Sequence, residues 1–219
     1  MRRLLATGIG VLFVFACVSE SARLRQQLNS ADPAIRADAC ERLGQLRDKK
    51  AAPLLIKLLQ DTVPAVRFSA ALALGNIGSA EAVAPLTRAI ENEPREDVAM
   101  AMTRALADLG PPAIEPLIKL TGSIKPLVRM TACRGLGRIG AHQAVEPLVR
   151  RIDDPDPNVR RAAIFALRRI GDERGLEAIA RRVQSPDWRT EENAEQALSG
   201  RGYEEQLQRI RQILRRFHH

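Results

Sequence analysis

Apolar residues recur along this chain with the period of an α-helix, in a pattern that itself returns about every 31 residues. From Val128 to Ile139 they stand at the first, fifth, ninth and twelfth positions, and a second series with helical spacing runs from Val145 to Ile152. Intervals of three and four residues place such side chains on one face of a helix. Gly140-Ala141 separates the two series. Each copy of the pattern is therefore predicted to be a hairpin of two short helices.

Six copies of this hairpin pattern occupy residues 32–217. They begin near Asp32, Asp61, Glu93, Ile124, Asp154 and Ser185. Self-similarity at this period is typical of a solenoid of stacked helix pairs. The last copy is degenerate, as capping repeats are. Residues 22–28 match the second helix of a further half repeat, which we place at residues 17–31.

Local signals predict where the first helix of each hairpin begins and ends. Asp32-Pro33 and Asp154-Pro155 are expected to supply a capping acceptor and a fixed φ at the start. The glycines expected to end first helices with a positive φ are Gly78, Gly110, Gly140 and Gly171. The interior column consists of Ala39, Ala70, Met102, Ala132, Ala163 and Ala194. Such small residues allow helices to approach closely, which agrees with a composition of 45% apolar but only 3% aromatic residues.

The order of residues within the copies resembles the HEAT repeats of the bilin-lyase type. These read Asp-Pro-x-Val-Arg, then Ala, then Leu-Gly-x-Ile-Gly, then Ala-Val-x-Pro-Leu, and the resemblance spans roughly residues 20–217, with Ala99 departing from the usual Arg. It implies an all-α fold, a right-handed α-solenoid of tandem HEAT-like helical hairpins with the second helices on its concave face. It does not imply one function, because such repeats occur in scaffolds, inhibitors, chaperones and a few enzymes.

The N-terminus has the pattern of an export signal. A basic start, Met1-Arg2-Arg3, precedes the uncharged apolar run from Leu4 to Ala16. That run is too short to span a bilayer comfortably. Because Val14-Phe15-Ala16-Cys17 resembles a bacterial lipobox, we expect residues 1–16 to be a signal peptide and Cys17 to carry a lipid. Ordinary cleavage after Ala16 and an uncleaved short anchor are the alternatives.

These N-terminal features predict a lipoprotein of the cell envelope, anchored in a membrane and facing the periplasm or the cell exterior. The half repeat starts almost directly after Cys17, so the tether is short, and Arg23 and Arg25 are expected near anionic headgroups. A cytoplasmic location is the alternative.

Residues with catalytic or metal-binding potential are sparse. The histidines are His142, His218 and His219, and their spacing does not place two ligands on one helical face with a third nearby. Iron-dependent HEAT-repeat hydroxylases carry repeated His-Glu pairs, whereas Gln143 follows His142 here. Cys40 and Cys133 occupy the same position in two copies and are expected to be buried core residues beyond disulfide reach. We therefore expect no catalytic residue, no metal site and no cofactor.

Basic residues recur on the predicted second helices. The chain carries a formal net charge of +8, and the residues proposed to bind a partner are Arg88, Lys119, Arg150, Arg151, Arg181, Arg182 and Arg211. Three of them follow an acid by four residues, which predicts the intrahelical pairs Glu115–Lys119, Glu146–Arg150 and Glu177–Arg181. An acidic or anionic partner and a merely solvated face are both compatible with this pattern.

A second basic series begins the first helices, at Arg36, Arg67, Arg129 and Arg160. We interpret it as a structural ladder in which each Arg pairs with an acid of the neighbouring layer. Specific nucleic-acid binding is not expected, because stacking aromatic residues are few.

These observations favour a noncatalytic protein–protein interaction scaffold or adaptor of the bacterial cell envelope. A partner protein, for which an acidic surface is one alternative, would bind the concave basic face. The membrane would be reached through the lipid, and no small-molecule substrate is expected. The alternative is a bilin-lyase-like enzyme subunit or chaperone that binds a tetrapyrrole or its apoprotein.

Overall fold

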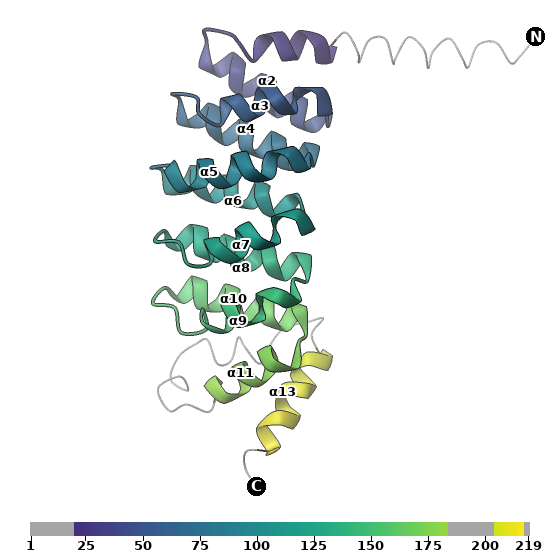
Figure 1. Cartoon of the computed structure of the whole chain (residues 1–219), viewed down its shortest axis with the longest axis vertical. Helices are drawn as coiled ribbons and strands as arrows, with labels where there is room; N and C mark the ends of the chain where they lie inside the picture. The colour runs from purple at the N-terminus through teal and green to yellow at the C-terminus, as the bar shows by residue number, and fades with distance from the viewer. Residues whose placement is uncertain (1–19, 184–203, 217–219) are drawn as a thin grey trace, which may run out of the picture. The chain divides into compact units, whose positions relative to one another are not determined.

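The computed structural model describes residues 20–183 and 204–216 as helices joined by short turns, with no strand among them (Figure 1). The chain divides into two compact units, residues 1–105 and residues 106–219. Each unit consists of helical hairpins stacked in layers, so the predicted fold class, an all-α solenoid of HEAT-like hairpins, is confirmed. Residues 1–16, Cys17, Ala194 and most of the last predicted repeat lie outside the described part.

Unit 1 contains two layers of helices that alternate along the chain. The first helices are α2 (Pro33–Gln45), α4 (Pro64–Ile77) and most of α6 (Glu96–Asp108). The second helices are residues 20–27, α3 (Ala52–Leu58) and α5 (Val83–Asn92), and short 3-10 turns, η1 (Lys49–Ala51) and η2 (Ala80–Ala82), precede the last two. Leu24, in the helix of residues 20–27, and Leu28, directly after it, are buried.

Unit 2 repeats this arrangement after the end of α6. Its first helices are α8 (Pro126–Ile139) and α10 (Pro157–Ile170). Its second helices are α7 (Ile114–Leu120), α9 (Val145–Val149) and α11 (Glu173–Val183). The 3-10 turns η3 (Pro111–Ala113) and η4 (His142–Ala144) precede α7 and α9. Helix α13 (Glu204–Arg216) packs on α11. Figure 1 shows α7, α9 and α11 on the same side of α8 and α10.

Proline and glycine mark the helix ends largely as predicted. Asp32 is the N-cap of α2, directly before Pro33, and its carboxylate accepts a hydrogen bond from the Ala34 amide at 2.8 Å. The four predicted glycines end or follow their first helices with φ between 71° and 75°. One capping prediction is wrong: the N-cap of α10 is Asp156, whereas Asp154 lies two residues earlier and accepts from the Asp156 amide at 3.1 Å.

Small residues bring the first helices together. The described members of the interior column are fully buried, Met102 included, so that methionine is a core residue. The closest approaches occur at glycine: a Cβ added to Gly44 would lie 2.8 Å from Cα of Ala73, and one added to Gly137 would lie 2.7 Å from Cα of Ala166. Packing this close leaves no space for a larger side chain on that face of the helix.

Candidate functional site: the second-helix face of unit 2

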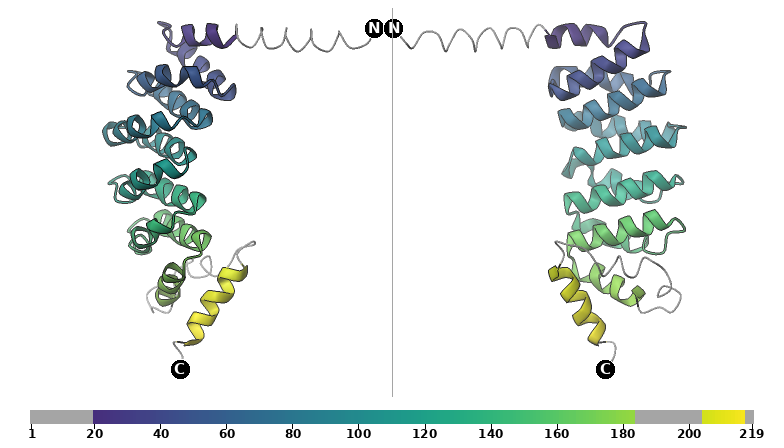
Figure 2. Two further views of the ribbon diagram at one scale, coloured as in Figure 1. Left: turned by 45° about the vertical axis from the view of Figure 1, so that its right-hand side comes forward. Right: turned by 180° about the vertical axis from the view of Figure 1, so that it is seen from behind.

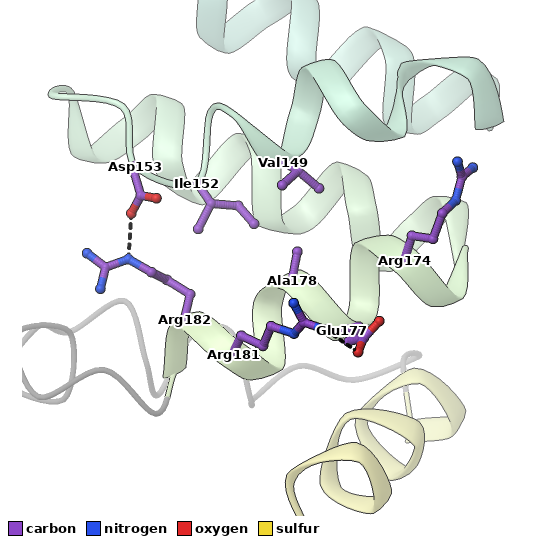
Figure 3. A pocket seen from close by; sticks show the side chains of 8 residues that line it. All are labelled: Val149, Ile152, Asp153, Arg174, Glu177, Ala178, Arg181 and Arg182. Carbon is purple, nitrogen blue, oxygen red and sulfur yellow. Dashed lines mark hydrogen bonds and ion pairs between the residues drawn. The ribbon is translucent and has the colours of Figure 1, made fainter. Parts of the chain in front are cut away.

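A hollow of about 700 Å³ lies between α9 and α11 in unit 2 (Figure 3). Val149 and Ile152 from the α9 side and Ala178 from α11 form its apolar part. Its charged lining residues are Asp153, Arg174, Glu177, Arg181 and Arg182. Two successive repeats therefore contribute to one concave site with an apolar floor and a rim of both charge signs.

Ion pairs neutralise several of the basic residues predicted to bind a partner. Arg181 pairs with Glu177 at 2.7 Å, which confirms that predicted intrahelical pair. Arg182 donates from Nε to the Asp153 carboxylate (Figure 3), and Nη1 of Arg151 lies 3.3 Å from Oδ2 of Asp154, a carboxylate that Arg151 shares with Arg129. The surface that α7, α9 and α11 form, which we call the second-helix face of unit 2, is consequently of mixed charge rather than simply basic.

The other predicted partner-binding residues are exposed cations. Arg88 belongs to α5 in unit 1, whereas Lys119, Arg150 and Arg211 belong to unit 2. Within residues 20–183 and 204–216 none of the four forms an ion pair, so the predicted Glu115–Lys119 and Glu146–Arg150 pairs are absent. Water solvates both members of such exposed pairs, and pairing therefore gains little.

The arginines that begin the first helices have a structural role, as predicted. Arg36 donates to both Asp61 oxygens at 2.8 and 2.9 Å, and Arg67 donates to both Glu93 oxygens at 2.6 and 2.8 Å. The Nη1 of Arg36 also donates to the carbonyls of Ser30 and Ala31. Each guanidinium thus ties the turn before its own helix to the turn before the next first helix.

The same contacts recur in unit 2. Arg129 binds Asp154 and the carbonyls of Ser123 and Ile124. Arg160 donates to the carbonyls of Asp154 and Pro155. These arginines are engaged in the fold, which agrees with their interpretation as a structural ladder.

Burial and hydrogen bonding act in opposite directions on the acids of this ladder. Burial of Asp61 and Asp154 would raise the pKa of each carboxyl. Hydrogen bonds from Arg36 and Arg129, together with backbone amides and nearby guanidinium charges, outweigh burial and hold both pKa values below the usual range. Both acids are therefore ionised at neutral pH.

Arg25, predicted to lie near lipid headgroups, forms an ion pair with Asp48. Its side chain is 24% exposed, whereas Arg23 is exposed. Arg42 similarly pairs with Glu20. These ion pairs with α2 and the start of η1 direct Arg25 toward the protein. Of the two arginines expected near anionic headgroups, Arg23 alone remains exposed.

Neither a metal-binding cluster nor a membrane-spanning helix occurs in the part of the chain that the structure describes. Cys40 and Cys133 are buried and unbonded, as predicted. Burial raises the pKa of each thiol to about 12.

These stacked hairpins define an α-solenoid repeat protein. The sequence matches HEAT repeats over residues 21–107, 89–156 and 146–217, and the chain therefore belongs to the HEAT-repeat family. No curated protein matches the sequence significantly.

Several solved structures are similar in fold. An engineered protein from the Northeast Structural Genomics Consortium is 22% identical with a TM-score of 0.57, and the alignment covers 89% of this chain and 97% of that one. A designed armadillo repeat protein in complex with the peptide (KR)4 is 21% identical with a TM-score of 0.57, over 88% and 98% of the two chains. The complex of CpcE and CpcF of phycocyanin lyase from Nostoc reaches 22% identity over 90% and 94%, but its TM-score of 0.47 is too low to support an inference about function. The tetrapyrrole alternative stays a prediction.

Proposed function

We propose that this HEAT-repeat protein is a noncatalytic scaffold that binds a partner protein on the second-helix face of unit 2. The hollow between α9 and α11 carries the proposal, because it combines an apolar floor at Val149 and Ala178 with charges of both signs at its rim. Protein interfaces have this composition, with an apolar centre and a polar edge. A polyanion such as nucleic acid would gain little there, because Arg181 and Arg182 are already paired with Glu177 and Asp153.

The repeat frame favours binding with little ordering cost. Each side chain of the hollow stands on or directly after a helix whose layer is fixed by buried leucines such as Leu148 and Leu176. Preorganised surfaces lose less conformational entropy on binding. The designed armadillo protein that holds the peptide (KR)4 shows that a solenoid of similar fold accommodates a peptide.

Selection of random displayed peptides against the full-length chain tests this proposal. Peptides that bind the hollow should bind at least about tenfold more weakly to Ala178→Trp, which fills it, and to Val149→Glu, which adds a charge to its floor. Gln143→Glu on the exposed surface of η4 is the control for a general change of charge. The site would be rejected if no peptide were selected. It would also be rejected if the selected peptides bound Ala178→Trp and Val149→Glu as tightly as wild type.

We further propose that the scaffold is held at the cell envelope by a lipid on Cys17, on the strength of the lipobox-like Val14-Phe15-Ala16-Cys17. Expression in a Gram-negative host with intact-mass measurement of the mature N-terminus tests this. A diacyl or triacyl mass increment that is absent from Cys17→Ser supports the anchor. An unmodified Met1 in soluble protein would return the cytoplasmic alternative to first place.

A further inference from the structure

The outer surface of α8 and α10 in unit 2 is distinct from the second-helix face. These two first helices pack against each other along their length, as the view from behind in Figure 2 shows. Their outward residues are Met130, Arg134 and Arg138 on α8 and Arg161, Phe165 and Arg169 on α10. We call this set the arginine face. Because the residues of each helix are four apart, they form two parallel rows with steps of about 6 Å, on helices about 8–10 Å apart.

The arginine face carries an unusual excess of positive charge. The helices α8 and α10 together contain seven arginines and no Asp or Glu. Arg129 is neutralised by Asp154 in the interior. On the outer surface, Arg138 pairs with Asp108 at 2.8 Å and Arg161 bonds to the Asn158 side chain. Among the described residues, Arg134 and Arg169 form no ion pair.

Helix stability does not account for this arrangement. Arg138 and Arg169 lie in last turns, where a cation is favourable to the helix dipole, but Arg161 lies near the N-terminal end of α10, where a cation is unfavourable. Arg134 and Arg138 are four residues apart, and like charges at that spacing destabilise a helix. A cluster that costs helix stability needs another explanation, and binding of negative charge supplies one.

The apolar members of the face indicate what kind of partner fits. Phe165 is 39% exposed and Met130 is partly buried, so the face combines a small apolar area with the arginine side chains around it. Membrane-binding surfaces commonly add apolar groups that protrude into the bilayer, and sites for single-stranded nucleic acid commonly add a series of open aromatic rings. A protein segment can place one apolar side chain onto Phe165 while its carboxylates reach the surrounding guanidinium groups.

A hollow of about 420 Å³ extends the face at the C-terminal ends of the first helices. Arg138 and Arg169 line it, together with Asp108, Gly110 and Pro111. The planar guanidinium group binds carboxylates in a two-point geometry that lysine cannot offer. Every cation of the arginine face is an arginine.

We infer that the arginine face binds an acidic segment of a protein partner, in which carboxylates pair with Arg134, Arg161 and Arg169 around an apolar side chain on Phe165. This site is separate from the hollow between α9 and α11 and does not depend on it. Charge complementarity specifies the partner, because the acids that neutralise the second-helix face have no counterpart on α8 and α10.

Fluorescence anisotropy with a labelled peptide of four Glu-Glu-Phe triplets tests the inference on the full-length chain. Wild type should bind this peptide at about 50 mM salt. The Arg134→Glu/Arg169→Glu variant should bind at least about tenfold more weakly, and Arg134→Gln/Arg169→Gln, which keeps the surface uncharged rather than reversed, should lie between them. The matched control is Lys50→Glu/Lys57→Glu on the exposed surface of η1 and α3, which changes the net charge equally outside the arginine face and should stay within about threefold of wild type.

Three results would overturn the inference. They are no binding by wild type, equal losses in the two charge-reversal variants, and stronger binding of an oligothymidylate or of phosphatidylglycerol vesicles with the same dependence on Arg134 and Arg169. The last result would assign the face to nucleic acid or to a membrane. Circular dichroism of each variant separates loss of binding from loss of fold.

Discussion

Arg129 donates to both oxygens of Asp154, 25 residues further along the chain, at 2.9 Å from Nε and 2.7 Å from Nη2. Their side chains are 10% and 0% exposed. Because Nη1 of Arg129 also donates to the Ser123 and Ile124 carbonyls, one guanidinium joins the turns before α8 and α10. The buried pair therefore couples two successive layers of unit 2.

Removal of Asp154 should weaken this coupling strongly. Asp154→Ala leaves the Arg129 guanidinium nearly buried without its carboxylate, and loss of one member of a buried pair typically costs about 3–5 kcal/mol. Urea unfolding followed by circular dichroism measures the effect. Asp97→Asn, which breaks the exposed Arg95–Asp97 pair, is the control and should leave the midpoint almost unchanged. Equal shifts in both variants would contradict a special role for the buried pair.

Acid should destabilise the fold through Asp61 and Asp154. Their pKa values are below the ordinary value of 3.8 in the folded chain, so the unfolded chain takes up protons first as pH falls through that value. The stability from these carboxylates is present above about pH 4 and is lost progressively as pH falls through the folded pKa values. Urea midpoints at about pH 5 and pH 3 should differ less in Asp61→Asn/Asp154→Asn than in wild type. An identical pH dependence would assign the acid sensitivity to other groups.

Cys40 and Cys133 should resist thiol reagents in the native state. Both are fully buried, and a pKa of about 12 leaves very little thiolate at neutral pH. In Cys17→Ser protein, Ellman's reagent should react with both thiols only as urea unfolds the chain. Rapid stoichiometric reaction before the unfolding transition would contradict the burial of these residues.

Gly137→Ala should destabilise unit 2. The added Cβ would lie 2.7 Å from Cα of Ala166, a backbone atom that cannot rotate away, and overpacking of this kind costs about 1–3 kcal/mol. Gly122→Ala, whose Cβ would be 3.4 Å from the nearest atom, should change the urea midpoint much less. Ala166→Gly should not restore Gly137→Ala fully, because the nearest atom belongs to the backbone. Complete rescue would show that the Ala166 methyl group alone causes the clash.

Local signals explain why the helices could be predicted. Proline in the first turn, glycine with positive φ, and apolar residues at intervals of three and four act within about one turn of helix, so they can be read without knowledge of the fold. Arg47 is an exception: with φ of 49°, it occupies the position that Gly78 has in the next repeat. Asn and Gly are the usual residues there, and no sequence rule would have indicated an arginine.

The partners of charged residues were predicted less well. That the first-helix arginines pair with an acid of the next layer followed from their recurrence, but Asp154 was expected to cap a helix and instead receives Arg129. Arg151 and Arg182 were predicted to bind a partner, yet they lie beside Asp154 and Asp153. The arginine face was missed, although the lack of any acid in residues 126–139 and 157–170 was a visible signal.

The spacing of residues along the chain is enough to predict the repeat, its period, the two helices in each copy and the turns between them, because these depend on interactions among residues close along the chain. Which cations are neutralised and which remain exposed depends instead on the packed fold. Arg182 meets Asp153 from the preceding repeat, whereas Arg134 has acids on neither its own helix nor α10. Such pairings depend on how far adjacent layers are displaced against each other and on side-chain rotamers, and neither quantity is encoded in the spacing of residues along one helix.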